Sequence, residues 1–138
     1  MKQALLFLSV FFLSVSAFAQ TEPTPTPTVN PPLNERIIGK WMYKGTEEFG
    51  VLAAPDSTQK NDFIELTADG NYKMMWSGKE EAGGYKLVEA YKQIYMTNAA
   101  NKKTKMFTIK SSLNGKLTLD YQTPDLVHTR YEYEKVKQ

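Results

Sequence analysis

Two tight-turn signals, each between runs of strand-forming residues, constrain the fold of this chain most. Asp69-Gly70 interrupts residues 63–76, and Asn114-Gly115 interrupts residues 105–121. Asp-Gly and Asn-Gly favour the two-residue turns that join antiparallel strands, because these residues readily adopt the positive φ that such turns require. The sequence therefore predicts two β-hairpins.

Five further short runs with strand character lie between residue 34 and the C-terminus, and we find no convincing amphipathic helix. Eight or nine short strands joined in sequence by tight turns indicate an all-β fold, either a sandwich or an antiparallel up-and-down barrel. Closure into a barrel, round or flattened, would remove exposed strand edges. The predicted strands are residues 37–44, 49–53, 63–67, 72–76, 84–88, 92–97, 105–111, 116–121 and 128–136.

Alternation along these strands separates a buried face from a solvated one. Tyr72, Met74 and Trp76 share one face of their strand, whereas Lys73 lies on the other. Trp41 and Tyr43 extend this aromatic and methionine-rich interior. The residues predicted to line the interior and to contact a ligand are Tyr72, Met74, Trp76, Tyr85, Met96, Phe107, Tyr121 and Tyr131.

Residues 1–19 have the parts of a cleavable secretory signal peptide: Lys2, an apolar stretch, and Ala17-Phe18-Ala19 before the predicted cleavage site. A membrane anchor is the alternative, but serines interrupt the apolar stretch, and a span needs about 20 mostly apolar residues. Because the chain contains no Cys, lipidation on cysteine is excluded. We expect an exported, soluble mature protein, periplasmic or secreted, that begins near Gln20.

Residues 20–33 contain five prolines that largely alternate with threonine. This composition favours extended polyproline II and does not bury a core, so the segment is either a glycosylated stalk or a disordered leader. The fold is then expected within residues 34–138 as one domain. With no cysteine, its stability depends on an apolar core or on oligomerisation.

The charge balance excludes one class of partner. The chain has 17 basic and 15 acidic residues, a net charge of +2, and loss of Lys2 with the signal peptide lowers the net charge by one. Such a chain has no strong field to attract nucleic acid or an anionic membrane. We therefore predict neither partner.

Gly39-Lys40-Trp41 follows a short segment, residues 33–38, at the head of the strand series. This arrangement is similar to the lipocalin N-terminal signature, in which a helical turn precedes Gly-x-Trp at the start of the first strand. Together with the Asp69-Gly70 hairpin and Gly83-Gly84-Tyr85, it makes residues 34–138 resemble the compact lipocalin-like domains of exported Bacteroidetes proteins.

The resemblance implies three residues that act structurally at one end of a barrel. Arg130, in the last strand, would lie against Trp41 through a cation–π contact, and Gly39 would allow close approach of the backbone. The sequence alternation, however, places Arg130 in phase with Glu132 and Glu134. We therefore expect either a bulge in that strand or a position of Arg130 at the barrel rim.

The residues needed for catalysis or metal binding are sparse. His128 is the only histidine, there is no Cys, and no Gly-x-Ser-x-Gly, His-x-x-x-His or phosphate-binding loop is present. We expect no enzymatic activity, no metal and no cofactor, with His128 structural or exposed. The adjacent acids Glu47-Glu48 and Glu80-Glu81 are predicted to be solvated surface.

The sequence therefore predicts an exported binding protein that holds a small, largely apolar ligand inside the barrel, at the open end opposite Trp41. The same side chains can instead fill an eight-stranded barrel. The alternative function is then a protein-interaction or inhibitor module that acts through the loops at residues 47–61 and 77–83. Asp56-Ser57-Thr58 also resembles the O-glycosylation sequon of Bacteroidetes.

Overall fold

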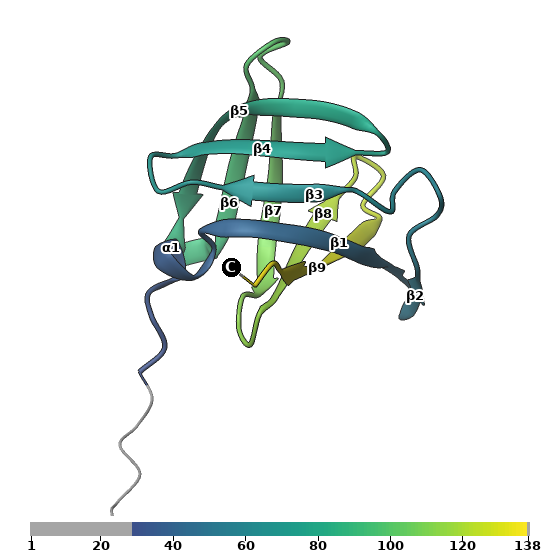
Figure 1. Ribbon diagram of the computed structural model, residues 1–138, viewed down its shortest axis with the longest axis horizontal. Helices are drawn as coiled ribbons and strands as arrows, with labels where there is room; N and C mark the ends of the chain where they lie inside the picture. Colours follow the sequence, from purple (N-terminus) through teal and green to yellow (C-terminus); the bar gives the residue numbers. More distant parts are fainter. Residues whose placement is uncertain (1–28, 138) are drawn as a thin grey trace, which may run out of the picture.

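The β-rich runs form the strands of a closed antiparallel barrel in the computed structural model, which describes residues 29–137 (Figure 1). Eight strands form the ring, and one short strand is added at its side. The elements are α1 (Leu33–Arg36), β1 (Gly39–Glu48), β2 (Val51–Ala53), β3 (Phe63–Leu66), β4 (Asn71–Trp76), β5 (Lys79–Val88), the 3₁₀ helix η1 (Glu89–Tyr91), β6 (Gln93–Asn98), β7 (Thr104–Ser111), β8 (Lys116–Gln122) and β9 (His128–Lys135).

Strands β3 to β9 pair in chain order, each antiparallel to the next. The ring closes through β1, which pairs with β3 along residues 39–42 and with β9 along residues 41–47. In Figure 1, β1, β3, β4 and β5 run across the front, and β6, β7 and β8 cross behind them at a steep angle. The predicted up-and-down barrel is confirmed, and its closure is consistent with a lipocalin-like fold.

The antiparallel order defines two ends of the barrel. The open end is the one at which four strands finish and the strands that pair with them begin; the four are β1, β4, β6 and β8. The opposite end, where α1 lies beside the start of β1, is the closed end (Figure 1). The short β2 pairs with β1 alone, near the open end. Its outer edge is therefore free of partners among the described residues.

Trp41 fills the closed end. Its indole is 1% exposed, and its Nε1 donates a hydrogen bond to the carbonyl of Ile37 at 2.8 Å. Ile37 and Leu33 are buried in the same core, so the short helical segment before Gly39 seals the barrel with apolar side chains. Leu33, which the sequence places at the end of the linker, belongs to the folded domain.

The prediction that Arg130 lies against Trp41 is wrong. The residue paired with Trp41 is Lys135, whose Nζ lies 5.1 Å from the indole centroid. Arg130 lies at the beginning of β9, near the open end, and its Nη1 donates to Glu47 Oε1 at 3.0 Å on the exposed outer face. A register shift in the β1–β9 pairing falls between Tyr43 and Gly45, but the phase of Arg130 is the outward phase that its alternation with Glu132 predicts.

The predicted loop at residues 77–83 is also wrong, because β5 begins at Lys79. Ser77 and Gly78 form a two-residue turn with φ of 47° and 75°, the positive values that suit an antiparallel hairpin. The buried carboxylate of Asp62 stabilises this turn by accepting a hydrogen bond from the Ser77 N–H at 2.7 Å. Of the predicted loop at residues 47–61, residues 47–48 belong to β1 and residues 51–53 to β2, so the loop before β3 is residues 54–62.

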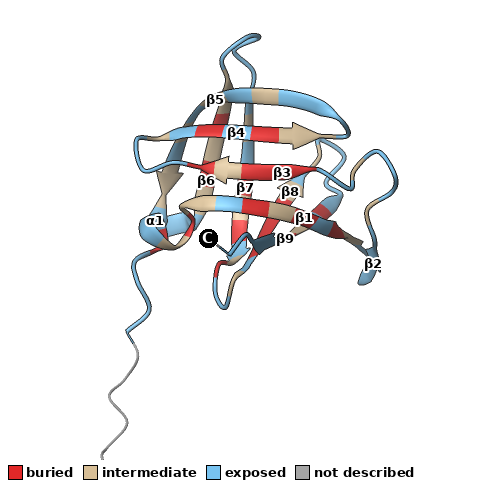
Figure 2. Ribbon diagram, viewed as in Figure 1, coloured by how far each residue is buried: buried red, intermediate tan, exposed pale blue. Residues whose placement is uncertain are grey.

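Burial alternates along β1 and β4, whereas β3 and β8 also bury neighbouring residues. Figure 2 shows buried residues on β1, β3, β4 and β6 to β9, whereas β2 is exposed throughout. Residues 29–137 include no helix that is both long and apolar enough to span a membrane. The predicted signal peptide and residues 20–28 of the predicted linker lie outside the described residues.

Candidate functional site

A pocket of about 140 Å³ lies between the walls of the barrel toward its open end. It is formed by side chains from four strands that do not all pair with one another, and most of these side chains are aromatic. The lining residues are Met74 and Trp76 from β4, Lys105 and Phe107 from β7, Tyr121 from β8, and Tyr131 from β9.

Neighbouring aromatic rings of the pocket contact one another, two pairs edge to face and one pair tilted. Trp76 and Tyr131 have centroids 4.7 Å apart at an interplanar angle of 86°, and Tyr131 continues to Phe107 at 6.3 Å and 73°. Phe107 is in turn 5.5 Å from Tyr121. Edge-to-face contact is favourable because the positive edge of one ring meets the negative face of the next. The rings therefore form a mutually supported wall.

Five of the eight predicted ligand-contacting residues line this pocket: Met74, Trp76, Phe107, Tyr121 and Tyr131. The other three have different surroundings. Met96 is 1% exposed and packs in the core. Tyr85 donates its hydroxyl to the Thr67 carbonyl at 2.7 Å, beside the β3–β4 turn, and Tyr72 is bonded to an acidic side chain described next.

Lys105 and Glu81 form an ion pair that the sequence analysis missed. Lys105 Nζ lies 3.1 Å from Glu81 Oε2, and Glu81 Oε1 accepts a hydrogen bond from the Tyr72 hydroxyl at 2.6 Å. The Glu81 side chain is only 17% exposed, so the prediction of a solvated surface is wrong for this residue, whereas Glu80 is 65% exposed. Both residues lie on the interior face of the barrel wall, because Glu81 is paired with Met74 and Lys105 is paired with Met96.

The surroundings of Glu81 favour its ionised form. Burial by itself raises the pKa of this carboxyl, but hydrogen bonds from Tyr72 and Lys105, the charge of Lys105 and a hydrogen bond from Asn98 outweigh burial and lower the pKa. The site therefore holds an ionised carboxylate beside the Lys105 side chain.

Burial is the main reason that the tyrosines of the interior resist ionisation. It raises the pKa of Tyr131 to about 12, with smaller contributions from Tyr43, Glu48 and Tyr121. The pKa of Tyr72 is raised in the same direction, by burial first and then by the Glu81 carboxylate. Both hydroxyls are protonated at neutral pH, so each can donate a hydrogen bond.

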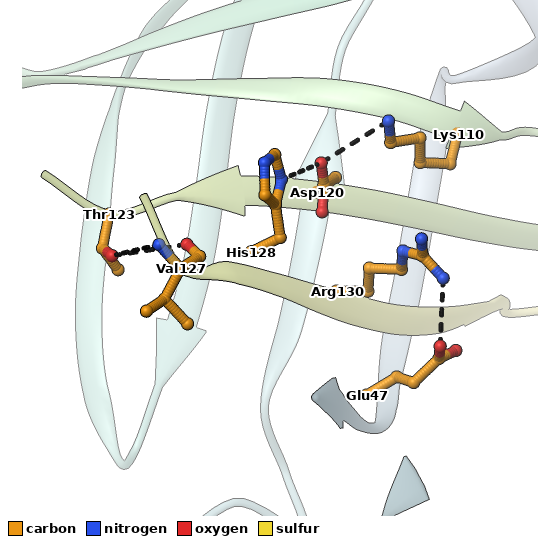
Figure 3. Close-up of polar contacts among 7 residues, drawn as sticks. All are labelled: Glu47, Lys110, Asp120, Thr123, Val127, His128 and Arg130. Carbon is orange, nitrogen blue, oxygen red and sulfur yellow. Dashed lines mark hydrogen bonds and ion pairs between the residues drawn. The ribbon is translucent and has the colours of Figure 1, made fainter. Parts of the chain in front are cut away.

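A second polar cluster lies on the outer face of the barrel (Figure 3). The Asp120 side chain is 4% exposed, and its Oδ2 is 2.9 Å from His128 Nδ1 and 3.5 Å from Lys110 Nζ. Asp120 Oδ1 has no partner among the described residues. Asp120 pairs with Arg130 in the outward phase of β8, so β8 separates this cluster from the pocket.

The outer cluster places one carboxylate between two basic side chains, those of Lys110 and His128. Three or more His, Cys, Asp or Glu side chains positioned to hold a metal ion are not found together within residues 29–137. His128 has a carboxylate partner, Asp120, in this cluster (Figure 3). The cluster is best explained as a covered ion pair on the barrel wall.

Exposed apolar side chains gather near the open end, on the turns outside the barrel. Phe49 is 91% exposed and Leu126 is 73% exposed, and a groove of about 340 Å³ between their two turns also includes Val127. Thr123 holds the second turn by hydrogen bonds to the backbone of Val127 (Figure 3).

The Asp56-Ser57-Thr58 sequence has a structural role in its loop. Asp56 Oδ1 accepts hydrogen bonds from the Thr58 N–H at 2.8 Å, from the Thr58 hydroxyl at 2.7 Å and from the Gln59 N–H at 3.1 Å. An aspartate that accepts from the backbone two or three residues ahead forms a local turn. The Asp56-Ser57-Thr58 pattern therefore forms a turn in the loop between β2 and β3, and its glycosylation stays a prediction.

A larger groove, about 870 Å³, lies outside the barrel at the closed end, between the start of β1 and the residues that follow β9. Its lining contains no aromatic side chain, and it includes the exposed lysines Lys40, Lys135 and Lys137. We place the candidate site in the aromatic pocket instead, because a ligand there contacts partly buried apolar surface. No protein-family model matches this sequence, and a search of curated proteins finds no match.

Proposed function

We propose that this protein binds a small, largely apolar molecule in the pocket at the open end of the barrel. The observation that carries the proposal is the ring of Trp76, Phe107, Tyr121 and Tyr131 around a space that their side chains do not fill. Ligand sites are typically concave and apolar with a few polar groups, and an eight-stranded barrel has room inside for one small ligand.

Binding would be driven by removal of apolar surface from water, about 25 cal/mol per Å² before the costs of association. The hydroxyls of Tyr121 and Tyr131 would orient the ligand at the mouth. We propose a binding function and not a catalytic one. In support, the only histidine, His128, is bonded to Asp120 on the outside of the barrel.

We also propose that the protein is exported and is of the lipocalin-like type found among exported Bacteroidetes proteins. Residues 1–19 support export by their signal-peptide pattern. The position of Gly39-Lys40-Trp41 at the head of a closed barrel, with Trp41 buried at the closed end, supports the relationship to lipocalins.

Filling the pocket tests the binding function. Tyr121→Trp adds bulk to the pocket wall, whereas Tyr95→Trp makes the same change on β6 at a residue outside the pocket lining. Toluene, benzyl alcohol and naphthalene are titrated while the indole N–H signal of Trp76 is followed by NMR. Trp41, whose indole is bonded to Ile37, serves as an internal reference.

We expect the smaller probes to shift the Trp76 signal in the wild type and in Tyr95→Trp, and to lose this effect in Tyr121→Trp. The Trp41 signal should stay in place. Absence of any Trp76 shift at millimolar probe concentration, or an equal shift in all three proteins, would contradict the proposed site.

A second function is favoured by the exposed apolar side chains of Phe49 and Leu126 beside one groove. Together with the free edge of β2, they suit a surface that contacts another protein. The same titration separates the two functions. Probe-induced shifts at the amides of Gly50 and Leu126, with Trp76 unchanged, would favour the surface over the pocket.

A further inference from the structure

We propose that the molecule bound in the aromatic pocket is a single-ring aromatic anion, with its ring among Trp76, Phe107, Tyr121 and Tyr131 and its negative charge on the ammonium of Lys105. An aromatic carboxylate is the simplest example. This inference rests on the proposed binding function and specifies the chemical class of the ligand.

The size of the pocket limits the ligand to about one ring. Its volume is about 140 Å³, close to the roughly 150 Å³ of an apolar cavity that accommodates benzene and below the roughly 300 Å³ at which pockets for drug-sized ligands begin. A long acyl chain or a fused polycyclic skeleton would require displacement of the edge-to-face contact between Trp76 and Tyr131, whose centroids are 4.7 Å apart.

The chemistry of the walls favours an aromatic ring over a saturated one. The Tyr131 ring already contacts both Trp76 and Phe107 with the ring planes near perpendicular. A planar guest can continue this pattern, because its edge meets the negative face of one wall ring and its face meets the positive edge of another. The Met74 thioether adds a polarizable contact of the kind that suits aromatic edges.

The charge of the ligand follows from Lys105, which is the only charged residue in the pocket lining. An ammonium has three hydrogen-bond donors, and Glu81 Oε2 accepts one of them at 3.1 Å. Glu81 is itself fixed from the other side by the Tyr72 hydroxyl. The pair therefore holds the Lys105 ammonium at the pocket with two donors available to a ligand.

Removal of water decides between a neutral and an anionic ligand. The Lys105 side chain is 42% exposed, so water can solvate its ammonium while the pocket is empty. A ligand that fills the mouth displaces this water, and charged donors left without acceptors are strongly unfavourable. A carboxylate on the ligand replaces the lost acceptors, a neutral ring does so poorly, and a cationic ligand is repelled by the ammonium.

Glu81 competes with the ligand for the same ammonium, which gives a reciprocal test. Lys105→Met removes the charge, and Glu81→Gln removes the competing carboxylate while it keeps an acceptor for Tyr72. Lys110→Met is the matched control, because it makes the same substitution on β7 at a residue whose partner is Asp120 on the outer face. The double variant Lys105→Met with Glu81→Gln leaves no buried charge without a partner.

The probes are benzoate, benzyl alcohol and benzylammonium, which present nearly the same ring with negative, neutral and positive head groups. Their affinities are measured on the purified protein from the shift of the Trp76 indole signal. We expect benzoate to bind the wild type most tightly, and Lys105→Met and the double variant to weaken benzoate by about tenfold or more. Glu81→Gln should strengthen benzoate binding, and Lys110→Met should leave all three affinities unchanged.

Equal affinity for benzoate and benzyl alcohol, or a loss of benzoate binding that is the same in Lys110→Met, would overturn the inference about the charge and leave the proposed pocket intact. Tightest binding of benzylammonium would overturn it in the same way. A Trp76 signal that no probe shifts would instead contradict the proposed function itself, so the two failures are distinguishable.

Discussion

The indole of Trp76 meets the ring of Tyr131 edge to face at a centroid distance of 4.7 Å, although β4 and β9 are not paired strands. The contact bridges the interior of the barrel between walls that are separated by β1 and β3. Side chains therefore fill the barrel at this level, and the pocket is the space that they leave toward the mouth.

Such a bridge predicts an energetic coupling between the two residues. In a double-mutant cycle with Trp76→Leu and Tyr131→Leu, we expect an interaction energy of about 0.5–1.5 kcal/mol, because an edge-to-face pair contributes this much beyond its buried area. Urea unfolding measures it. The matched cycle of Trp76→Leu with Tyr95→Leu should be additive, and additivity of the Trp76 and Tyr131 variants would exclude the bridge in solution.

Gly83 and Gly84 are adjacent in β5, and we expect opposite tolerance of an added methyl group. A Cβ on Gly83 would lie 2.0 Å from the Thr97 carbonyl oxygen, whereas a Cβ on Gly84 would lie 3.7 Å from its nearest neighbour, the Gly70 carbonyl oxygen. Gly83→Ala should lower the free energy of unfolding by about 1–3 kcal/mol, or more where the backbone must move. Gly84→Ala is the control, and similar melting temperatures for both variants would refute the close contact.

Lys135, and not Arg130, lies over Trp41 at the closed end, so substitutions of these two basic residues of β9 should differ in their effects on stability and on the Trp41 signal. Lys135→Met should lower the free energy of unfolding by about 0.5–1 kcal/mol, the usual contribution of an exposed cation over an indole, and should shift the NMR signal of the Trp41 indole. Arg130→Met removes a cation whose partner is Glu47, so the Trp41 signal should stay in place. A Trp41 shift in Arg130→Met alone would support the arrangement that the sequence resemblance implied.

The interior tyrosines predict a loss of stability at alkaline pH. The pKa of Tyr131 is about 12 in the folded protein, against about 10 in an unfolded chain. The folded-state pKa is the higher one, so the folded state binds this proton more tightly. The contribution of Tyr131 to the free energy of unfolding is therefore complete below about pH 10 and is lost as pH rises toward 12. Burial raises the pKa of Tyr43, Tyr72 and Tyr133 in the same direction.

Two measurements check this prediction. The free energy of unfolding should fall between pH 10 and pH 12, and tyrosinate absorbance should rise together with the loss of near-ultraviolet circular dichroism. The same titration in concentrated urea is the control and should show ordinary phenol ionisation. Full tyrosine ionisation near pH 10 in a protein that remains folded would contradict the burial of these side chains.

Much of the fold could be predicted from the sequence because the turns and the alternation are local signals. Asp69-Gly70 and Asn114-Gly115 lie at the two expected turns, and the inward phase of β4 is buried as the pattern indicates. The Ser77-Gly78 turn was missed because Ser is an unusual residue at positive φ. Its stabilisation by Asp62 comes from 15 residues away in the chain.

The candidate site could be predicted only in part, for a physical reason. Hydrophobicity identifies Met74, Trp76 and Phe107 as inward residues, but it does not identify Glu81 and Lys105, because both are charged. Their inward positions become favourable because Glu81 on β5 and Lys105 on β7 meet across β6, 3.1 Å apart. Alternation along the strands does indicate their positions, because Glu81 shares a strand face with Gly83 and Lys105 shares a strand face with Phe107. Which basic residue reaches Trp41 depends on the register of β9 against β1, and a single sequence does not specify that register.

Closure of the ring between β1 and β9 also has a consequence for the order of folding. The last strand of the barrel pairs with the first, residue 41 with residue 135, so the barrel cannot close until nearly the whole domain has left the ribosome or a translocation channel. Contacts between such distant residues slow folding, because a long loop must be ordered before they form. Until then the edge of β1 along residues 41–47 lacks the strand that covers it in the folded barrel, and an unpaired edge favours pairing with another chain.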